Sequence, residues 1–353
     1  MNDTQNINER QRKILKVVSQ LKKPTRAEIE AELPHSVDIS KPTLLRELSD
    51  LESKGLIFAS GESRAVRYST DQNSEILYYV DVDELFNTPP DERMLAGRSV
   101  HEFLDIIERV DFLTGQDLDT IARVNEGFLD RVGEADPTIF KKEIERFTIE
   151  LAWKSSAIEG NTYSLIETEQ LLKNHQEAFG KSRGETQMIL NHKIALDYIL
   201  EHLSDYRKLS LADVMEIHRL LTGGLEIAGG IRDGMVRITG TRYIPPSGYL
   251  QIREYLERLI DIVNEKKHPV ENALIISGCL AYLQPFVDGN KRTSRLVSNA
   301  ILLAHNHSAL SYRAVSEGTY KKGILLIDEQ QDFYFHKQVF LDQYYFASEN
   351  YLI

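Results

Sequence analysis

Apolar side chains recur at every third or fourth position through most of this 353-residue chain, and that spacing predicts helices. The pattern is clear in "VHEFLDIIERVDFL", "DLDTIARVNEGFLDRV" and "FKKEIERFTIELAWKSSAIEG", which begin at Val100, Asp117 and Phe140. It continues to about residue 350. The sequence therefore predicts a mainly α-helical fold, with helices that bury one face each.

One stretch of this region interrupts the helical pattern. The string "GMVRITGTRYIPPSG" at 234–248 combines β-branched residues with flanking glycines. Such a composition favours either a short β-hairpin or an irregular arm. Both alternatives remain open at the level of the sequence.

The N-terminal region has a different pattern. Residues 8–21 have helical spacing, Thr25 and Glu28 form a capping box for a second helix, and "KPTLLRELSDLESKG" predicts a third helix from Lys41. Two β-prone runs around Gly61 then predict a hairpin. Three helices followed by a hairpin resemble a winged helix-turn-helix domain, which we assign to residues 1–72.

In a winged helix-turn-helix domain, the start of the third helix enters the major groove of DNA. Residues 1–70 carry twelve Lys and Arg against ten Asp and Glu, whereas the remainder of the chain carries 30 against 44. DNA contact is therefore electrostatically easiest in this head. The candidate contacts are Lys41, Thr43 and Arg46 for the groove, and Arg64 and Arg67 for phosphates. The alternative is a winged helix used for protein contact or dimerisation.

Composition limits the class of protein. The chain contains no run of about 18 apolar residues, so we expect no membrane contact. Its polar N-terminus and single cysteine, Cys279, favour a cytoplasmic protein without a disulfide framework. The prolines in "NTPPDER" at 87–93 indicate a boundary. We expect a helical junction over residues 73–135 and a second domain over residues 136–353.

The stretch "LQPFVDGNKRTSR" at 283–295 has the composition of an anion-binding site. It lies between two apolar helical patterns, the second of which we place after Arg292. The N-terminus of a helix offers free N–H groups to phosphate. Gly289 and Asn290 favour a turn that gathers such groups, and Arg292 and Arg295 would lie on one side of the new helix. Asp288 suits a magnesium ion bound between phosphates.

The same stretch resembles the Fic (Fido) family signature, His-x-Phe-x-(Asp/Glu)-Gly-Asn-(Gly/Lys)-Arg-x-x-Arg. The matching positions are Phe286, Asp288, Gly289, Asn290, Lys291, Arg292 and Arg295. The string "SSAIEGN" is similar to the family's inhibitory motif at Ser155, Glu159 and Gly160. The string "GGIRDGMVRITGTRYIPPS" at 229–247 is similar to the family's target-docking arm, here Ile238, Thr239, Gly240, Thr241, Arg242 and Tyr243.

This resemblance implies a Fic-type helical bundle with a short hairpin arm. It also implies transfer of AMP from ATP, with Mg²⁺ at Asp288, onto a hydroxyl of a target protein that pairs with the arm. In such a site the Gly289–Asn290 turn and Arg292 hold the phosphates. Glu159 would pair with Arg295 in place of the γ-phosphate and so inhibit the protein. A homodimer is expected by resemblance alone.

The signature departs from the family at its first position, where Gln284 replaces the catalytic histidine. An amide cannot accept a proton near neutral pH, and it can only orient by hydrogen bonds. Loss of a general base typically costs on the order of 10²–10⁴ in rate. Transfer is then lost, or persists weakly through positioning, or uses another group such as Glu159. The alternative to an impaired enzyme is a catalytically silent transcriptional regulator that senses a nucleotide or a protein.

Overall fold

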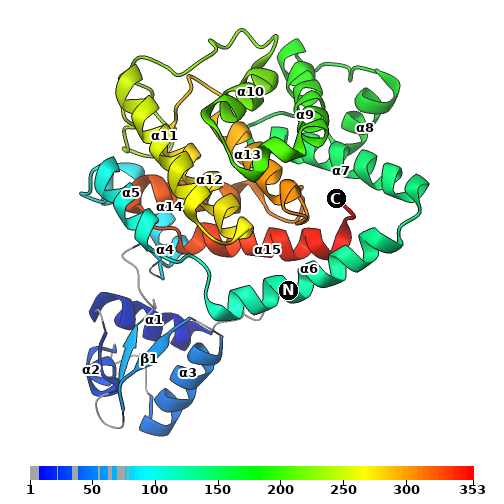
Figure 1. Ribbon diagram of the computed structural model, residues 1–353. Coiled ribbons are helices and arrows are strands. Elements are labelled where there is room, and N and C mark those ends of the chain that lie inside the picture. Colours follow the sequence, from blue (N-terminus) through cyan, green and yellow to red (C-terminus); the bar gives the residue numbers. More distant parts are fainter. Residues whose placement is uncertain are drawn as a thin grey trace.

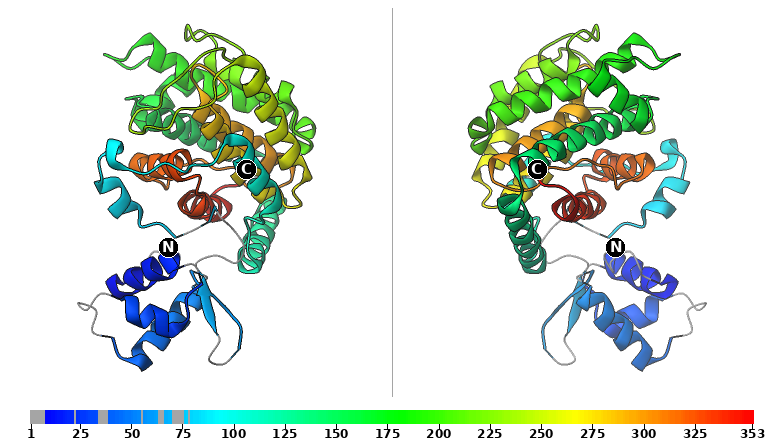
Figure 2. Two further views of the ribbon diagram at one scale, coloured as in Figure 1. Left: turned by 90° about the vertical axis from the view of Figure 1, so that its left-hand side faces the viewer. Right: turned by 90° about the vertical axis from the view of Figure 1, so that its right-hand side faces the viewer.

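The computed structural model describes residues 8–21, 23–33, 39–54, 56–62, 66–69, 76–77 and 79–353. Within them the chain forms a small N-terminal head and a larger helical body (Figure 1). Two further views show the head at one end of the molecule, with the long helix α6 (Gly115–Glu134) along the body (Figure 2). The prediction of a mainly α-helical fold is confirmed.

The described part of the head contains three helices and two short strands, in the order that the sequence predicts. They are α1 (Glu9–Leu21), α2 (Arg26–Glu32), α3 (Lys41–Ser53), β1 (Phe58–Ser60) and β2 (Arg67–Ser69). The strands are antiparallel, with Ala59 opposite Tyr68. The capping box of Thr25 and Glu28 opens α2 as expected. Leucine, isoleucine and valine side chains from the three helices form a core separate from that of the body.

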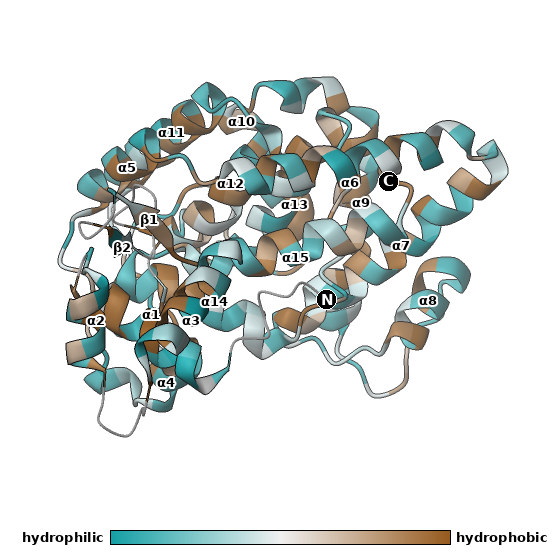
Figure 3. Cartoon of the chain, turned by 90° about the horizontal axis from the view of Figure 1, so that it is seen from below, coloured by the Kyte–Doolittle hydropathy of each residue, from teal (hydrophilic) through white to brown (hydrophobic). Residues whose placement is uncertain are grey.

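The body is built around two adjacent helices, α12 (Pro269–Leu283) and α13 (Asn290–Ala304), which are almost entirely buried. Other helices surround this pair (Figure 1). The surrounding helices are α5 (Val100–Arg109), α7 (Pro137–Ile158), α8 (Leu165–Asn174), α9 (Arg183–Glu201), α10 (Leu211–Thr222), α11 (Tyr249–Glu265), α14 (Glu317–Gln330) and α15 (Tyr334–Asn350). Helices such as α5 and α11 alternate hydrophilic and hydrophobic segments, as amphipathic helices do (Figure 3).

Close packing at the centre of the body depends on Gly278 in α12. A Cβ atom at this position would lie 2.5 Å from a ring carbon of Phe333 and 2.8 Å from a methyl carbon of Ile327. Cys279 beside it is fully buried, as a core residue would be. The absence of a side chain at Gly278 therefore lets the start of α15 approach α12 closely.

A connecting segment links the head to the body. It contains α4 (Val82–Asn87) and a short 3₁₀ helix at Pro90–Glu92. Tyr79 packs edge-on against Tyr334 of α15, and both pack against the core of the head. In α4, Asp83 pairs with Lys322 of the body. No described helix combines the length and apolar character that crossing a bilayer requires.

The stretch 234–248 contains no strand, so of the two alternatives the irregular arm is observed. The short hairpin that we expected in this arm is not formed. Its backbone is held by long side chains rather than by strand pairing. Arg93 donates to Gly240 O and also pairs with Glu329 of α14 at 3.0 Å. In turn, Arg242 donates to the carbonyl of Arg93 at 2.7 Å.

Candidate functional site

The signature loop, residues 284–289, joins α12 to α13 at the centre of the body. Helix α12 ends at Gln284, whose φ of 48° places it in the left-handed region. Helix α13 begins at Asn290, with Gly289 as its N-cap residue. The sequence pattern predicts this start after Arg292, but Asn290, Lys291 and Arg292 already form the first turn of α13. Their backbone N–H groups are therefore those of a helix N-terminus, and no side chain caps it.

Gly289 is required at this turn for two reasons. Its φ of 83° lies in the region that favours glycine. A Cβ atom there would also lie 3.2 Å from Cγ2 of Thr222 in α10. The Gly289 N–H already donates to Oδ1 of Asp288 at 2.5 Å. An anion at this terminus would therefore bind to the N–H groups that follow Gly289.

The side chain of Asn290 closes the loop. Its Oδ1 accepts from the N–H of Phe286 at 2.8 Å, and its Nδ2 donates to Phe286 O at 2.9 Å. The same Nδ2 donates to Oε1 of Gln284 at 2.9 Å, while Nε2 of Gln284 donates to Ala281 O at 2.6 Å. Both ends of the Gln284 amide are thus occupied by local hydrogen bonds. Gln284 acts here as part of the loop's structure.

Arg292 and Arg295 are two buried cations. Their exposed fractions are 2% and 0%. Nη1 of each guanidinium is buried and makes no hydrogen bond within the described residues. Arg292 has one carboxylate nearby, Oδ2 of Asp288 at 3.3 Å. Buried cations with unsatisfied N–H groups are costly, so this cluster favours an anionic ligand.

Glu159 reaches this cluster from the end of α7. Its Oε1 lies 3.0 Å from Nη2 of Arg295, and its Oε2 lies 3.7 Å from Nζ of Lys291. Burial acts to raise the pKa of Glu159, but Arg295 and Lys291 outweigh it, and the pKa is lowered. Burial likewise acts to lower the pKa of Arg295, but Tyr320 and Glu159 raise it. The two groups therefore form a charged pair at neutral pH.

The residues around Glu159 hold it in place. Ser155 is fully buried, and its Oγ and its carbonyl oxygen accept from Nε and Nη2 of Arg295 at 3.0 and 2.9 Å. Gly160 follows with a φ of 94° and donates to Ala157 O, which turns the chain at the end of α7. Beyond this turn, Glu185 of α9 accepts from the N–H and hydroxyl of Thr162. The segment after the helix is therefore tied to α9.

Asp288 is the most exposed member of the cluster, with a side chain that is 65% exposed. Among the described residues, no group of three or more His, Cys, Asp and Glu side chains is arranged to hold a metal. A magnesium ion that is shared with phosphates needs only one or two carboxylates from the protein. The exposed Asp288 beside the helix N-terminus fits that coordination.

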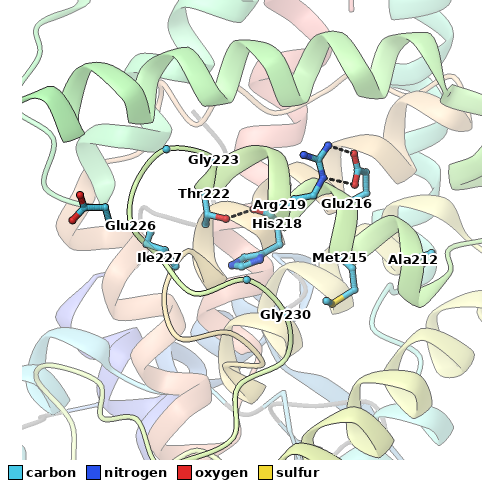
Figure 4. A pocket seen from close by; sticks show the side chains of 12 residues that line it. Ala212, Met215, Glu216, His218, Arg219, Thr222, Gly223, Glu226, Ile227 and Gly230 are labelled. Carbon is cyan, nitrogen blue, oxygen red and sulfur yellow. Dashed lines mark hydrogen bonds and ion pairs between the residues drawn. The ribbon is translucent and has the colours of Figure 1, made fainter.

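An open cavity of about 580 Å³ lies beside α10 (Figure 4). It is lined by one side of α10, from Ala212 to Thr222, and by the glycine-rich segment 223–230. Its lining includes the buried His218 and the ion pair of Glu216 and Arg219 (Figure 4). The ring of His218 stacks on Phe286 at 3.7 Å, and its Nε2–H donates to Asp288 O at 3.0 Å. His218 thus connects the lining of the cavity to Asp288.

The other predicted site residues fall into two groups. In the arm, Tyr243 stacks on Tyr282 of α12 at 4.7 Å, while Thr239 and Gly240 are exposed. This part of the arm therefore borders the signature loop, although it forms no strand.

In the head, Lys41 and Arg46 are exposed on α3, and Thr43 is half-buried. Arg67 donates to Lys23 O at 2.9 Å and lies 3.8 Å from Glu28. It is thus engaged within the head. Arg64 lies outside the described residues.

Sequence reasoning missed several residues that support the loop. Arg232 is 4% exposed and donates from Nε to Gln284 O at 2.6 Å and from Nη2 to Pro246 O at 2.6 Å. It thereby fastens the loop to the arm. An arginine among the glycines of "GGIRDG" was a visible signal, because a buried cation there needs backbone acceptors. His192 and His218 gave no such signal, because an isolated histidine on a helix is common.

Comparison with known proteins agrees with this geometry. Residues 208–302, which include α10 to α12 and most of α13, match the model of the Fic/DOC family. A "Protein adenylyltransferase Fic" from Drosophila virilis is 33% identical over 182 residues, which is 50% of this chain and 36% of that protein. Its counterpart from Drosophila willistoni is 29% identical over 221 residues, or 61% of this chain and 42% of that protein. This chain therefore spans less than half of the length of these relatives.

Solved structures share the fold at lower identity. Fic-1 from C. elegans aligns with a TM-score of 0.58 and 23% identity, over 67% of this chain and 70% of that chain. A Fic domain containing signaling protein from Bacteroides thetaiotaomicron aligns with a TM-score of 0.56 and 18% identity, over 66% and 94%. These likenesses establish a shared fold for about two thirds of the chain.

Proposed function

We propose, from the match of residues 208–302 to the Fic/DOC family model, that this chain binds ATP with Mg²⁺ at the signature loop. In this proposal AMP transfer to the hydroxyl of a target protein is impaired by Gln284 and inhibited by Glu159. The matched relatives are named adenylyltransferases. That name describes those proteins, and its extension to this chain is the proposal.

The observation that carries nucleotide binding is the charge balance of the loop. Arg292 and Arg295 are buried, and each has an Nη1 without a hydrogen bond in the described part of the chain. The N-terminus of α13 has no side-chain cap and begins beside them. A guanidinium binds phosphate oxygens with two N–H groups, and a helix N-terminus favours the same charge. A polyphosphate satisfies both requirements at once.

Glu159 supplies the inhibition in this proposal. Its carboxylate bonds to Nη2 of Arg295 at 3.0 Å, where it competes with a phosphate for the same guanidinium. Because its pKa is lowered, it remains an anion at neutral pH. A γ-phosphate that binds to Arg295 must therefore displace Glu159.

The signature loop also supplies the groups for magnesium, for the transferred phosphate and for the incoming hydroxyl. Magnesium would neutralise phosphate charge and orient the leaving group, and Asp288 is the residue that would hold it. The N–H groups at the start of α13 would bind the transferred phosphate together with Arg292. Gln284 can hydrogen-bond to an incoming hydroxyl, but it cannot take the proton. Its amide is also occupied by Asn290 and Ala281 O, so transfer should be slow.

The second candidate is a silent regulator, and the state of Gln284 favours it. A side chain fixed at both ends by local bonds is suited to structure rather than to proton transfer. In this candidate, nucleotide occupancy or the Glu159 contact changes how the head binds DNA. The connecting segment offers a physical link, because Arg93 contacts both α14 and the arm. The exposed start of α3 would then be the DNA-contacting surface.

Labelled ATP with Mg²⁺ separates these candidates. We expect no label on the unaltered protein, and weak label on itself or on a lysate protein for Glu159→Gly. We expect strong label for Glu159→Gly combined with Gln284→His, because the base is restored and the γ-phosphate site is open. Glu177→Gly, which removes an exposed carboxylate of the loop after α8, is the matched control.

The three outcomes have different meanings. Label on Glu159→Gly alone rejects the silent regulator. Label only on the double variant means that Gln284 is the lesion in an otherwise intact site. Absence of label from every variant rejects AMP transfer by this fold.

A further inference from the structure

Behind Arg295, a series of buried hydrogen bonds passes through Ser155 to His192, a residue that belongs to neither the signature nor the inhibitory motif. His192 of α9 is 1% exposed, and its Nε2 lies 2.8 Å from Oγ of Ser155. Ser155 Oγ in turn accepts from Nε of Arg295. His192, Ser155 and Arg295 are all buried, so solvent cannot replace the hydrogen bonds between them. The loss of one partner would leave the next without a substitute.

The carbonyl oxygen of Met188 determines which atom donates in each of these hydrogen bonds. Nδ1 of His192 lies 2.8 Å from Met188 O, and a carbonyl oxygen can only accept. Nδ1 therefore carries the proton and donates, which leaves Nε2 of the neutral ring as an acceptor. The hydroxyl of Ser155 must then donate to Nε2. Its oxygen lone pairs thus face Arg295 and accept from Nε–H.

This arrangement fixes one edge of the Arg295 guanidinium. The hydroxyl oxygen of Ser155 accepts a hydrogen bond from Nε of Arg295, and its carbonyl oxygen accepts one from Nη2. The Nη1 group remains without a hydrogen bond in the described residues. Burial lowers the pKa of His192 to about 3, so the ring stays neutral and the direction of the hydrogen bonds does not change at ordinary pH.

We propose that His192 is a positioning residue for Arg295, which it orients through the hydroxyl of Ser155 so that the guanidinium can grip a terminal phosphate. This inference rests on the proposed function, because the phosphate is the γ-phosphate of the bound nucleotide. It assigns His192 no contact with the ligand. Its role is to hold the direction of the Ser155 hydroxyl and so the plane of Arg295.

The test compares binding of two nucleotides by calorimetry with Mg²⁺, in the Glu159→Gly background so that the inhibitory carboxylate is absent. A non-hydrolysable ATP analogue would contact Arg295, whereas AMP has no γ-phosphate. We expect His192→Leu to weaken binding of the ATP analogue about tenfold, which corresponds to the loss of one buried hydrogen bond. We expect AMP affinity to be unchanged.

Two further variants control for a merely structural effect. In His192→Gln, the amide oxygen can accept from Ser155, and we expect binding of the ATP analogue to return close to the parent value. His307 is another buried histidine, with Nδ1 2.7 Å from the hydroxyl of Tyr344. We expect His307→Leu to leave the ratio of the two affinities unchanged. Equal weakening of ATP analogue and AMP by His192→Leu, or no change in either, would overturn the inference.

A second readout separates failure of the inference from failure of the proposed function. The Nε–H of Arg295 is buried, so we expect its ¹⁵N resonance to be protected from exchange with solvent. Its absence in Arg295→Lys assigns this resonance. It should become exchangeable in His192→Leu and stay protected in His192→Gln. If Glu159→Gly binds no nucleotide, the proposed function fails, and this resonance decides the positioning role. Its persistence in His192→Leu would then reject that role.

Discussion

Arg295 is the residue on which the site depends, because it has several partners with opposite consequences. Ser155 fixes its inner edge, Glu159 neutralises it, and a phosphate would compete with Glu159 for it. Tyr312 and Tyr320 enclose it, with ring centroids 5.9 and 5.1 Å from its central carbon. A buried guanidinium with one carboxylate in reach is stable only while that carboxylate stays ionised.

The Glu159–Arg295 pair has a defined pH dependence. Because the pKa of Glu159 is lowered in the folded protein, its stabilisation is present above the ordinary glutamate pKa and is lost as pH falls through the folded value. We expect Glu159→Gln to reduce the free energy of unfolding by about 1–2 kcal/mol. The difference should be constant from pH 6 to pH 8 and should shrink below about pH 4.

Urea unfolding of the two proteins across this pH range measures the difference. Glu177→Gln is the matched control, because this exposed carboxylate should change stability little at any pH. A difference that varied steeply near pH 7 would contradict a lowered pKa for Glu159. It would also remove the basis for its role as a permanent competitor of phosphate.

At the scale of residues, the sequence predicted the Glu159–Arg295 pair but not the side chains that hold it in place. The family motifs placed Glu159 and Arg295 together across 136 residues of chain, and the 3.0 Å contact agrees. Nothing in the sequence indicated that Gln284 would be bonded at both ends, because that depends on the turn of Asn290. His192 was missed because its partner Ser155 is reached only through the packing of α9 against α7.

At the scale of elements, the start of α3 is the surface that decides whether the head binds DNA. Lys41 and Arg46 are exposed there, in the place where a recognition helix contacts base edges. We expect a mobility shift on the gene's own upstream DNA. Binding should weaken on the order of a hundredfold between 50 and 200 mM salt if about four phosphates are contacted.

The variants for this prediction change charge on one helix only. Lys41→Glu combined with Arg46→Glu should abolish the shift, because two attractive charges become repulsive. Lys141→Glu combined with Lys142→Glu, on exposed positions of α7, makes the same change of charge on the body and should have no effect. Absence of a shift at low salt for the unaltered protein would reject DNA binding.

The positions of helices were predicted well where the spacing of apolar residues determines them. They were predicted less well where the backbone conformation of a single residue determines where a helix begins. The helices of the body follow their apolar stripes. The start of α13 was placed three residues late, because the left-handed Gly289 ends the turn before the apolar pattern resumes. The arm reads as β-prone, yet Arg93 and Arg232 bind its carbonyl groups and leave it irregular.

At the scale of the whole molecule, the connecting segment relates the head to the site. Lys16 of the head pairs with Glu84, and Asp83 beside it pairs with Lys322 of α14. Helix α14 also carries Tyr320, which faces Arg295. A change at Arg295 therefore has a contiguous packed route to the head, although such a route shows only that coupling is physically available.

The measurement that tests the account most directly is calorimetry of ATP with Mg²⁺ on the unaltered protein, on Glu159→Gly and on Glu177→Gly. We predict that Glu159→Gly binds at least about tenfold more tightly than the other two, because the γ-phosphate no longer competes with a carboxylate for Arg295. Equal affinity in all three, or no binding by any, would contradict the claim that Glu159 and a triphosphate share Arg295.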